Sequence, residues 1–412
     1  MLSRVEDFGL NRWYLLLINS RFHITAAQTV HVGIVGADLR RKHPAVSSSN
    51  SYYQHFYDAD HEDLSVTTFE MYVNSTAAAS IIADSEEFCG ESLAHRAKWL
   101  SMHVSSVELT AATDGEVASA MSWRSDRIPV MLLSLSVPLE SSIPLTLKQV
   151  EHNAERSNEG KGVFMVVGSG DGGLGTCTYN SLANSPYTIV VGATNRLHDK
   201  ADYSSSCSAI LVSAPGGDSK AGIPSASSLA PPGSNEESDL CYDDWFGTRA
   251  AAAHVAGLAA HILTLRPSLG WRDIKWIIAT TATNKTCMDG GWTLNAAGYA
   301  HSLTHGYGVV NTTAALYRAK AWAPLPPMSV VKSRTLSLLQ PIPIDGSTVS
   351  SSYLNVNNIT IEEVAVTVSI QFQNPNHLEI SLISPSGTKS LLSPFQGVFE
   401  TIILEYGNKK VS

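Results

Sequence analysis

Residues 247–257 read GTRAAAAHVAG, and no other stretch says as much about the fold of the chain. It opens a segment, Ala250 to Leu265, that is apolar on nearly every face of a helix. A helix without a polar face predicts a position in the middle of a domain, where other elements cover it on all sides. The breaker Pro267 follows it, and residues 271–281 (WRDIKWIIATT) predict a second helix.

Apolar runs and helical segments alternate upstream of this helix. Four runs predict buried strands, namely 30–35 (VHVGIV), 128–136 (IPVMLLSLS), 161–168 (KGVFMVVG) and 187–192 (YTIVVG). Three other segments predict helices, at 93–103, 116–123 and 145–156. Strands that alternate with helices indicate an α/β fold with a parallel sheet, whose functional site lies at the carboxyl ends of the strands.

The sequence changes character after residue 322. Residues 322–327 (WAPLPP) predict a linker, because three prolines in this run cannot continue a helix. Further on, 360–370 (TIEEVAVTVSI) and 377–384 (HLEISLIS) alternate apolar and polar residues, and a turn (PSG) follows at 385–387. We therefore predict an α/β domain over residues 1–322, a linker over 323–328 and an antiparallel β module over 329–412.

The composition limits the class of partner. Of the 412 residues, 44% are hydrophobic, which supplies a large core and excludes a mainly disordered chain. The 28 Lys and Arg against 37 Asp and Glu give a net charge of −9, so we expect no nucleic-acid partner. The apolar run 13–18 is short and lacks a cleavage site, so the sequence predicts neither a signal peptide nor a membrane span.

The stretch 247–257 resembles the segment that bears the nucleophile in subtilisin-like serine proteases, where it usually reads close to GTSAAAPHVAG. Other strings are similar to the kexin/furin proprotein convertases of that family: 161–173 (KGVFMVVGSGDGG), 184–188 (NSPYT), 271–273 (WRD), 306–308 (GYG) and, in their P (Homo B) domain, 377–388 (HLEISLISPSGT). The resemblance runs from about Asp7 to Pro394. It implies a subtilisin-like parallel sheet flanked by helices, followed by an incomplete β-sandwich P domain that is truncated at Ser412.

The cysteines fit this resemblance. There are five, without any CxxC pair, which excludes a zinc ribbon and a thioredoxin motif. The resemblance implies the disulfides Cys89–Cys241 and Cys177–Cys207 with Cys287 free, and five reduced cysteines are the alternative. Because disulfides persist in oxidising compartments, it also implies a protein of the secretory pathway or the extracellular space. Glycosylation sequons point the same way, at Asn74, Asn284, Asn311 and Asn358.

The catalytic residues of the family are replaced. A serine protease needs a nucleophile, an imidazole that takes its proton and a carboxylate that orients the imidazole. At the matching positions this sequence has Arg249 for the serine, Met71 for the histidine and Gly36 for the aspartate. A guanidinium stays protonated and only donates hydrogen bonds, so Arg249 cannot attack a carbonyl. Asp38 and His61 are the nearest substitutes, and each needs a rebuilt loop.

The positions that recognise substrate have changed as well. The oxyanion position carries Asp171, and we expect a buried ion pair between Asp171 and Arg249. The aspartate that selects basic residues in the S1 pocket is matched by Asn180, an uncharged amide. The SWGPEDDG string, with its backbone edge and carboxylates, is matched by residues 136–142 (SVPLESS).

The calcium ligands of the family are also eroded. Two of its acidic ligands are matched by Ala45 and Ser205, and neither side chain offers the carboxylate oxygens that calcium prefers. The resemblance therefore implies that the calcium sites are largely lost, and we expect no metal site and no cofactor.

The replacements spare the glycines, the long helix and the cysteines that maintain a fold. This favours a pseudoprotease, a kexin-like chain that binds a peptide or protein ligand, with an active protease among the partners it would fit. An extended peptide would be held as an added strand. The alternatives are an active proprotein-processing endopeptidase with a rebuilt triad, a sequence that misreports the true gene product, and a decayed chain that does not fold.

Overall fold

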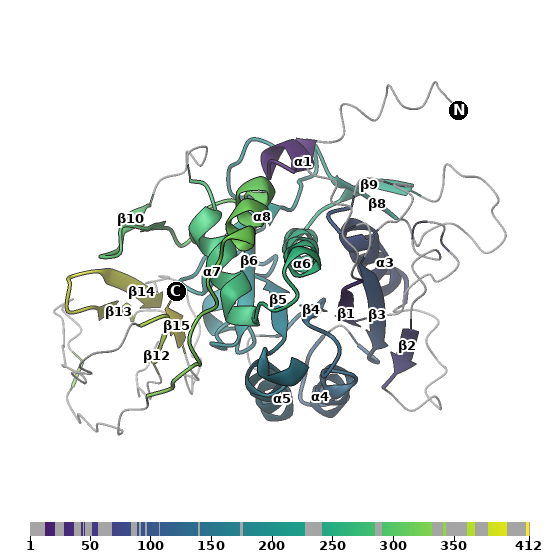
Figure 1. Cartoon of the computed structure of the whole chain (residues 1–412), viewed down its shortest axis with the longest axis horizontal. Helices are drawn as coiled ribbons and strands as arrows, with labels where there is room; N and C mark the ends of the chain where they lie inside the picture. The colour runs from purple at the N-terminus through teal and green to yellow at the C-terminus, as the bar shows by residue number, and fades with distance from the viewer. Residues whose placement is uncertain are drawn as a thin grey trace.

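The computed structural model in Figure 1 contains the whole chain. It describes residues 13–20, 29–36, 43, 45, 52–56, 68–83, 89, 92–94, 97–106, 108–138, 141–173, 176–226, 241–284, 291–331, 341–342, 361–366, 378–393 and 409–411. Among these residues, no helix combines the length and apolarity that crossing a bilayer requires.

A parallel sheet forms the centre of the α/β domain. Within the described ranges it has seven strands, in the order β2-β3-β1-β4-β5-β6-β7. In that order they are Tyr52–His55, Lys98–His103, His31–Gly36, Val130–Leu133, Phe164–Gly168, Thr188–Thr194 and Ile210–Pro215. All neighbouring pairs run parallel, so the carboxyl ends lie at one edge of the sheet and the predicted α/β fold is confirmed.

Helices cover both faces of the sheet (Figure 1). The pair α4 (Asp114–Ser122) and α5 (Pro144–Glu155) lies on one face, and α3 (Thr68–Ala83) and α6 (Thr248–Leu265) lie on the other. Helix α8 (Thr312–Lys320) packs against α6 and α7 (Trp271–Thr281). The remaining short elements are α1 (Trp13–Leu17), the 3₁₀ turns η2 (Asn158–Gly160) and η3 (Thr176–Tyr179), and the strand pairs β8–β9 (Ile223–Ala226, Cys241–Trp245) and β10–β11 (Thr293–Leu294, Ala300–His301).

Helix α6 is the central helix that its apolar sequence predicts. Every residue from Ala250 to Ile262 is buried, because α3, α8 and the sheet surround it. Small side chains let neighbours approach closely, and a Cβ added at Gly257 would lie 3.0 Å from the Cβ of Leu93.

The prediction of a helix over 93–103 is wrong, because residues 98–103 form β3. This strand pairs with β1 on one side and β2 on the other, and all but its first residue are buried. A short apolar run fits a buried strand as well as a buried helix, and pairing with two flanking strands decides between them here.

The C-terminal β module consists of antiparallel pairs in the part that the structure describes. Strand β12 (Val364–Val366) pairs with β15 (Lys409–Val411), and β13 (Ile380–Ile383) pairs with β14 (Lys389–Ser393). Gly387, with φ of +86°, lies in the predicted turn between β13 and β14. The antiparallel pairing is therefore confirmed, and the boundaries at 322 and 328 stay a prediction.

The β module is attached to α7 by charged side chains. Arg272 and Lys275 of α7 form ion pairs with Glu362 and Glu363, the two residues before β12. The side chain of Lys275 is only 4% exposed, so this contact is largely shielded from water. Asp273 fixes the segment that joins the two parts, because its Oδ1 accepts hydrogen bonds from Trp322 Nε1 (2.9 Å) and Leu325 N (2.8 Å).

Candidate functional site

The end of β5 and the start of α6 meet at the carboxyl edge of the sheet. A Cβ added at Gly168, the last residue of β5, would lie 2.6 Å from Oγ1 of Thr248, the first residue of α6. Thr248 Oγ1 also accepts a hydrogen bond from Gly170 N at 3.2 Å. Gly168 is therefore required for this approach, which brings the nucleophile position of the family beside its oxyanion position.

The N-terminus of α6 is fixed by Tyr203 and Asp171. Gly247 precedes the helix with φ of +141°, a conformation that favours glycine, and its N–H donates to the Tyr203 hydroxyl at 3.1 Å. That hydroxyl donates to the carbonyls of Gly216 and Gly217, each at 2.8 Å. Burial, together with the negative charge of Asp171, raises the pKa of Tyr203, so the group stays a neutral phenol.

Asp171 caps this helix rather than forming an ion pair. Its Oδ1 accepts a hydrogen bond from Thr248 N at 2.8 Å, which places the carboxylate at the positive end of the helix dipole. Asp171 is exposed, Arg249 is half-buried, and these two described residues form no ion pair with each other. The expected buried ion pair is therefore wrong, since the carboxylate is already bound by the backbone and reaches solvent.

Gly36, at the carboxylate position, is the last residue of β1 and is buried. A Cβ added there would lie 3.2 Å from Ser134 O, 3.3 Å from Ser134 Cβ and 3.3 Å from Ser75 Oγ. The hydroxyls of Ser75 and Ser134 are buried and make no hydrogen bond among the described residues. Two serines therefore crowd the space that an aspartate side chain would enter.

The imidazole position is less fully described. Met71 lies in α3, with its side chain outside the described part, and Asp38 and His61 also fall outside it. The strand register places His55 and His103 in a row with Gly36, and their rings lie 4.7 Å apart. Sequence reasoning missed this pair, because it depends on the register of β1, β2 and β3.

His254, in the second turn of α6, has a structural role, as its place in an apolar helix predicts. It is fully buried, and its Nδ1 lies 3.0 Å from the carbonyl of Ala250. Burial lowers the pKa of His254 to about 4, so the ring is neutral at physiological pH.

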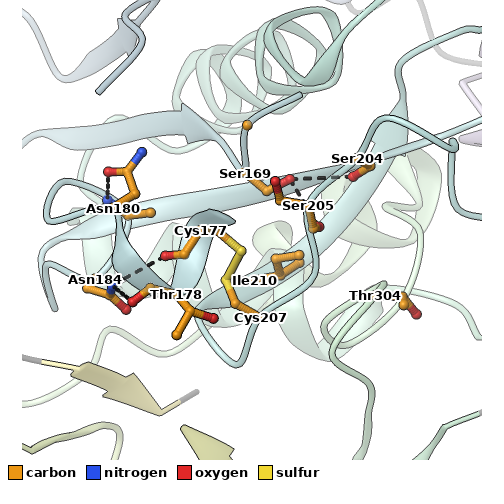
Figure 2. The surroundings of a disulfide bond; sticks show 12 residues. Ser169, Cys177, Thr178, Asn180, Asn184, Ser204, Ser205, Cys207, Ile210 and Thr304 are labelled. Carbon is orange, nitrogen blue, oxygen red and sulfur yellow. Dashed lines mark hydrogen bonds between the residues drawn. A yellow bond between two sulfur atoms is a disulfide. The ribbon is translucent and has the colours of Figure 1, made fainter. Parts of the chain in front are cut away.

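Asn180, at the S1 position, follows the turn η3 (Figure 2). Its Oδ1 accepts hydrogen bonds from Leu182 N and Ala183 N, each at 3.0 Å, so the carbonyl half of the amide holds the local turn. The amide carries no charge that could neutralise a basic side chain.

Both predicted disulfides are present. Cys89 is bonded to Cys241 and Cys177 to Cys207, with Cα–Cα distances of 5.2 and 5.9 Å. Figure 2 shows the second bond joining η3 to the segment that precedes β7. Cys287 lies outside the described residues, so its free state stays a prediction.

The two residues matched by resemblance to calcium ligands of the family, Ala45 and Ser205, carry no carboxylate that could bind the ion. Ser205 is fully buried and carries no charge, and its N–H donates to Gly170 O at 3.0 Å. Nearby carbonyls already bind a cation, because Lys200 Nζ donates to Ser204 O (2.9 Å) and Ala201 O (3.1 Å). Across the described ranges, no group of three or more His, Cys, Asp or Glu side chains is arranged to hold a metal.

Comparison with known families explains this geometry. The profile of the subtilase family of peptidases matches residues 27–308. The chain belongs to the subtilase family. The profile of the proprotein convertase P-domain matches residues 361–398, within the β module of this subtilase.

Its relatives include proprotein convertases. The chain is 34% identical over 253 residues to human proprotein convertase subtilisin/kexin type 7, a match that covers 59% of this subtilase and 32% of the human protein. It is 26% identical over 336 residues to the protease KEX1 of Kluyveromyces lactis, a match that covers 78% and 43% of the two chains. This subtilase therefore spans about a third to under half of the length of these relatives.

Solved structures share the fold. The Aeromonas sobria serine protease, in complex with its chaperone, has a TM-score of 0.74 at 22% identity, over 94% of this chain and 80% of that one. A cold-adapted subtilisin-like serine proteinase has a TM-score of 0.52 at 18% identity, over 73% and 97% of the chains. Both confirm the predicted subtilisin-like fold.

Proposed function

We propose that this kexin-like subtilase does not hydrolyse peptides and acts by binding a peptide or protein ligand, with an active protease among the partners that fit. The observation that carries the proposal is the site itself. The nucleophile position is Arg249, a permanent cation in the first turn of α6, and the carboxylate position is Gly36, crowded by Ser134 and Ser75.

Physical chemistry supports the loss of hydrolysis. Removing the triad of a serine protease leaves a rate only about 10³ to 10⁴ above that of water, which comes from the oxyanion donors and substrate binding. That magnitude is known from subtilisin, a relative of this chain. Here the oxyanion position, Asp171, is engaged as a helix cap and offers an acceptor instead of a donor.

A location in the secretory pathway or outside the cell is part of this proposal. Two disulfides, each with both cysteines in the folded domain, support an oxidising compartment. The relatives named as proprotein convertases support the same compartment by family resemblance.

The test is hydrolysis of a mixed peptide library by the purified protein, beside Arg249→Ser and Arg249→Ala variants and human type 7 convertase as the positive control. We expect no cleavage by the wild type or either variant, and a cooperative melt must show that each is folded. A fluorophosphonate probe, which labels activated serines, should leave all three unlabelled. Cleavage by the wild type would refute the proposal and favour an active endopeptidase with a rebuilt triad.

A further inference from the structure

Four glycosylation sequons have no role in the proposed binding function. They lie at Asn74, Asn284, Asn311 and Asn358. A sequon can carry an N-linked glycan in a folded protein where the surface leaves room for a bulky, solvated group. The burial of each motif therefore separates usable sequons from chance matches. Asn358 lies outside the described residues, so three sequons can be compared.

The first sequon lies inside a buried helix. Asn74 belongs to α3, and the two residues that complete its motif, Ser75 and Thr76, are both buried. Every residue of this helix from Ser75 to Ala83 is buried, because the helix packs between α6, the sheet and β8. The described side chains of α3 offer no exposed face, so we expect no glycan at Asn74.

The sequon at Asn311 is built into the start of α8. Oδ1 of Asn311 accepts hydrogen bonds from Ala314 N at 3.0 Å and from Asn19 Nδ2 at 3.3 Å. The hydroxyl of Thr313, which completes the motif, donates to the carbonyl of Asn19. Thr312, between the two, is buried. The segment after α1 therefore covers this motif, and a glycan on Asn311 would have to displace it.

The sequon at Asn284 begins with an exposed residue. Asn284 follows the end of α7 and belongs to no helix or strand. The backbone just before it is fixed, since Thr283 N donates to Val309 O at 2.8 Å and Val309 N donates to Thr283 O at 2.9 Å. Thr286, which completes the motif, lies outside the described residues, and the motif needs only its identity.

Strand pairing places Asn284 far from the candidate site. Beyond β7 the pairing continues from Ser213 to Val309 and from Val309 to Thr283. Four pairing steps thus separate Thr283 from β5: β5 to β6, β6 to β7, β7 to Val309, and Val309 to Thr283. At about 4.8 Å a step, the distance from β5 is roughly 19 Å. The attachment point is therefore remote from the start of α6, where the ligand of the proposed function would bind.

We infer that Asn284 is the residue that carries an N-linked glycan among the three described sequons. The donor is an oligosaccharide linked through a pyrophosphate to a lipid. A bond forms between Nδ2 of Asn284 and C1 of the first sugar, the bond from C1 to the pyrophosphate oxygen breaks, and Nδ2 releases one proton as the lipid pyrophosphate leaves. This inference rests on the proposed location in the secretory pathway, where such a donor is available.

The test is expression of the whole chain behind an added secretion signal in cultured animal cells. Thr286→Ala removes the motif and keeps Asn284, and Thr286→Ser is the matched control because it retains a hydroxyl. Asn74→Gln and Asn311→Gln remove the other two motifs. Peptide N-glycosidase in heavy-oxygen water converts each glycosylated asparagine to a labelled aspartate, which mass spectrometry locates in the chain. Medium and cell lysate are both measured, so a chain that is not exported also gives a result.

We expect label at position 284 in most molecules of the wild type and of Thr286→Ser, and none there in Thr286→Ala. The mobility of Thr286→Ala in gel electrophoresis should increase, whereas that of Asn74→Gln and Asn311→Gln should equal the wild type. The glycosidase should also remove the glycan from the folded protein, because Asn284 is exposed.

Two results would overturn the inference. One is an unlabelled Asn284 in both medium and lysate, and the other is label at Asn74 or Asn311 at an occupancy equal to that of Asn284. The added signal makes these results independent of the proposed function. Peptide hydrolysis by the wild type would refute the binding proposal and leave the glycan standing, and detection of the natural protein in the cytosol would refute the proposed location.

Discussion

Replacing Glu363 by alanine should weaken the attachment of the β module to α7. Glu363 forms an ion pair with Lys275 Nζ, and the two side chains are 12% and 4% exposed. The variant leaves the ammonium of Lys275 in this shielded position without its carboxylate. The ring of Trp271 lies 6.0 Å from Nζ, which is too far for it to replace the lost charge.

The expected loss is large because the remaining charge is buried. Removing one partner of a buried ion pair costs about 3–5 kcal/mol of the free energy of unfolding. With a urea m-value of about 2–3 kcal/mol/M, the midpoint of unfolding should fall by about 1–2 M. Tryptophan emission reports the transition, since Trp271 and Trp276 lie on α7 beside the pair.

A double variant separates burial of charge from loss of contact. Glu363→Ala combined with Lys275→Met removes both charges and should recover most of the loss, because no unpaired charge stays buried. The exposed pair Lys389–Glu379 is the matched control, and Lys389→Ala should change stability by less than about 1 kcal/mol. The reasoning that Glu363→Ala leaves a buried, unpaired charge is refuted by either of two results. One is a loss of unfolding free energy in Glu363→Ala as small as that in Lys389→Ala, and the other is a double variant that is as unstable as Glu363→Ala alone.

Three further outcomes are expected. Burial acts to raise the pKa of Glu362, but the hydrogen bond and charge of Arg272 outweigh it and hold that pKa below the ordinary 4.5. The contribution of this ion pair to the stability of the folded protein is therefore complete above about pH 4.5 and is lost as the pH falls further. Urea unfolding curves between pH 3 and 6 will show this loss. Gly168→Ala should lower stability by about 1–3 kcal/mol, because its methyl would overlap Thr248 Oγ1, and unchanged urea unfolding would contradict the tight approach. Asp171→Ala should cost about 1 kcal/mol as a lost helix cap, measured the same way, with Asp171→Asn retaining more of the stability than Asp171→Ala.

The candidate site shows why position and environment must both be known. Motif matching identifies Arg249 and Gly36 as replacements, because it needs only the order of residues. Charge alone predicts an ion pair between Arg249 and Asp171 that does not form. The N–H of Thr248 binds the Asp171 carboxylate instead, and this donor is placed there by the folded backbone. The charges of the side chains alone could not predict it.

Local patterns were enough to predict the α/β class and the central helix, because both depend on apolar runs that are contiguous in the chain. The family resemblance predicted both disulfides, whose cysteines lie far apart in the sequence. The replacement of the nucleophile and of the S1 charge rests on motif matching and stays a prediction. Two others required the folded chain: residues 98–103 form a strand, and His55 and His103 align with Gly36. Each of these depends on which strands become neighbours, and pairing between distant segments is set by the packing of the whole sheet rather than by the residues of any one segment.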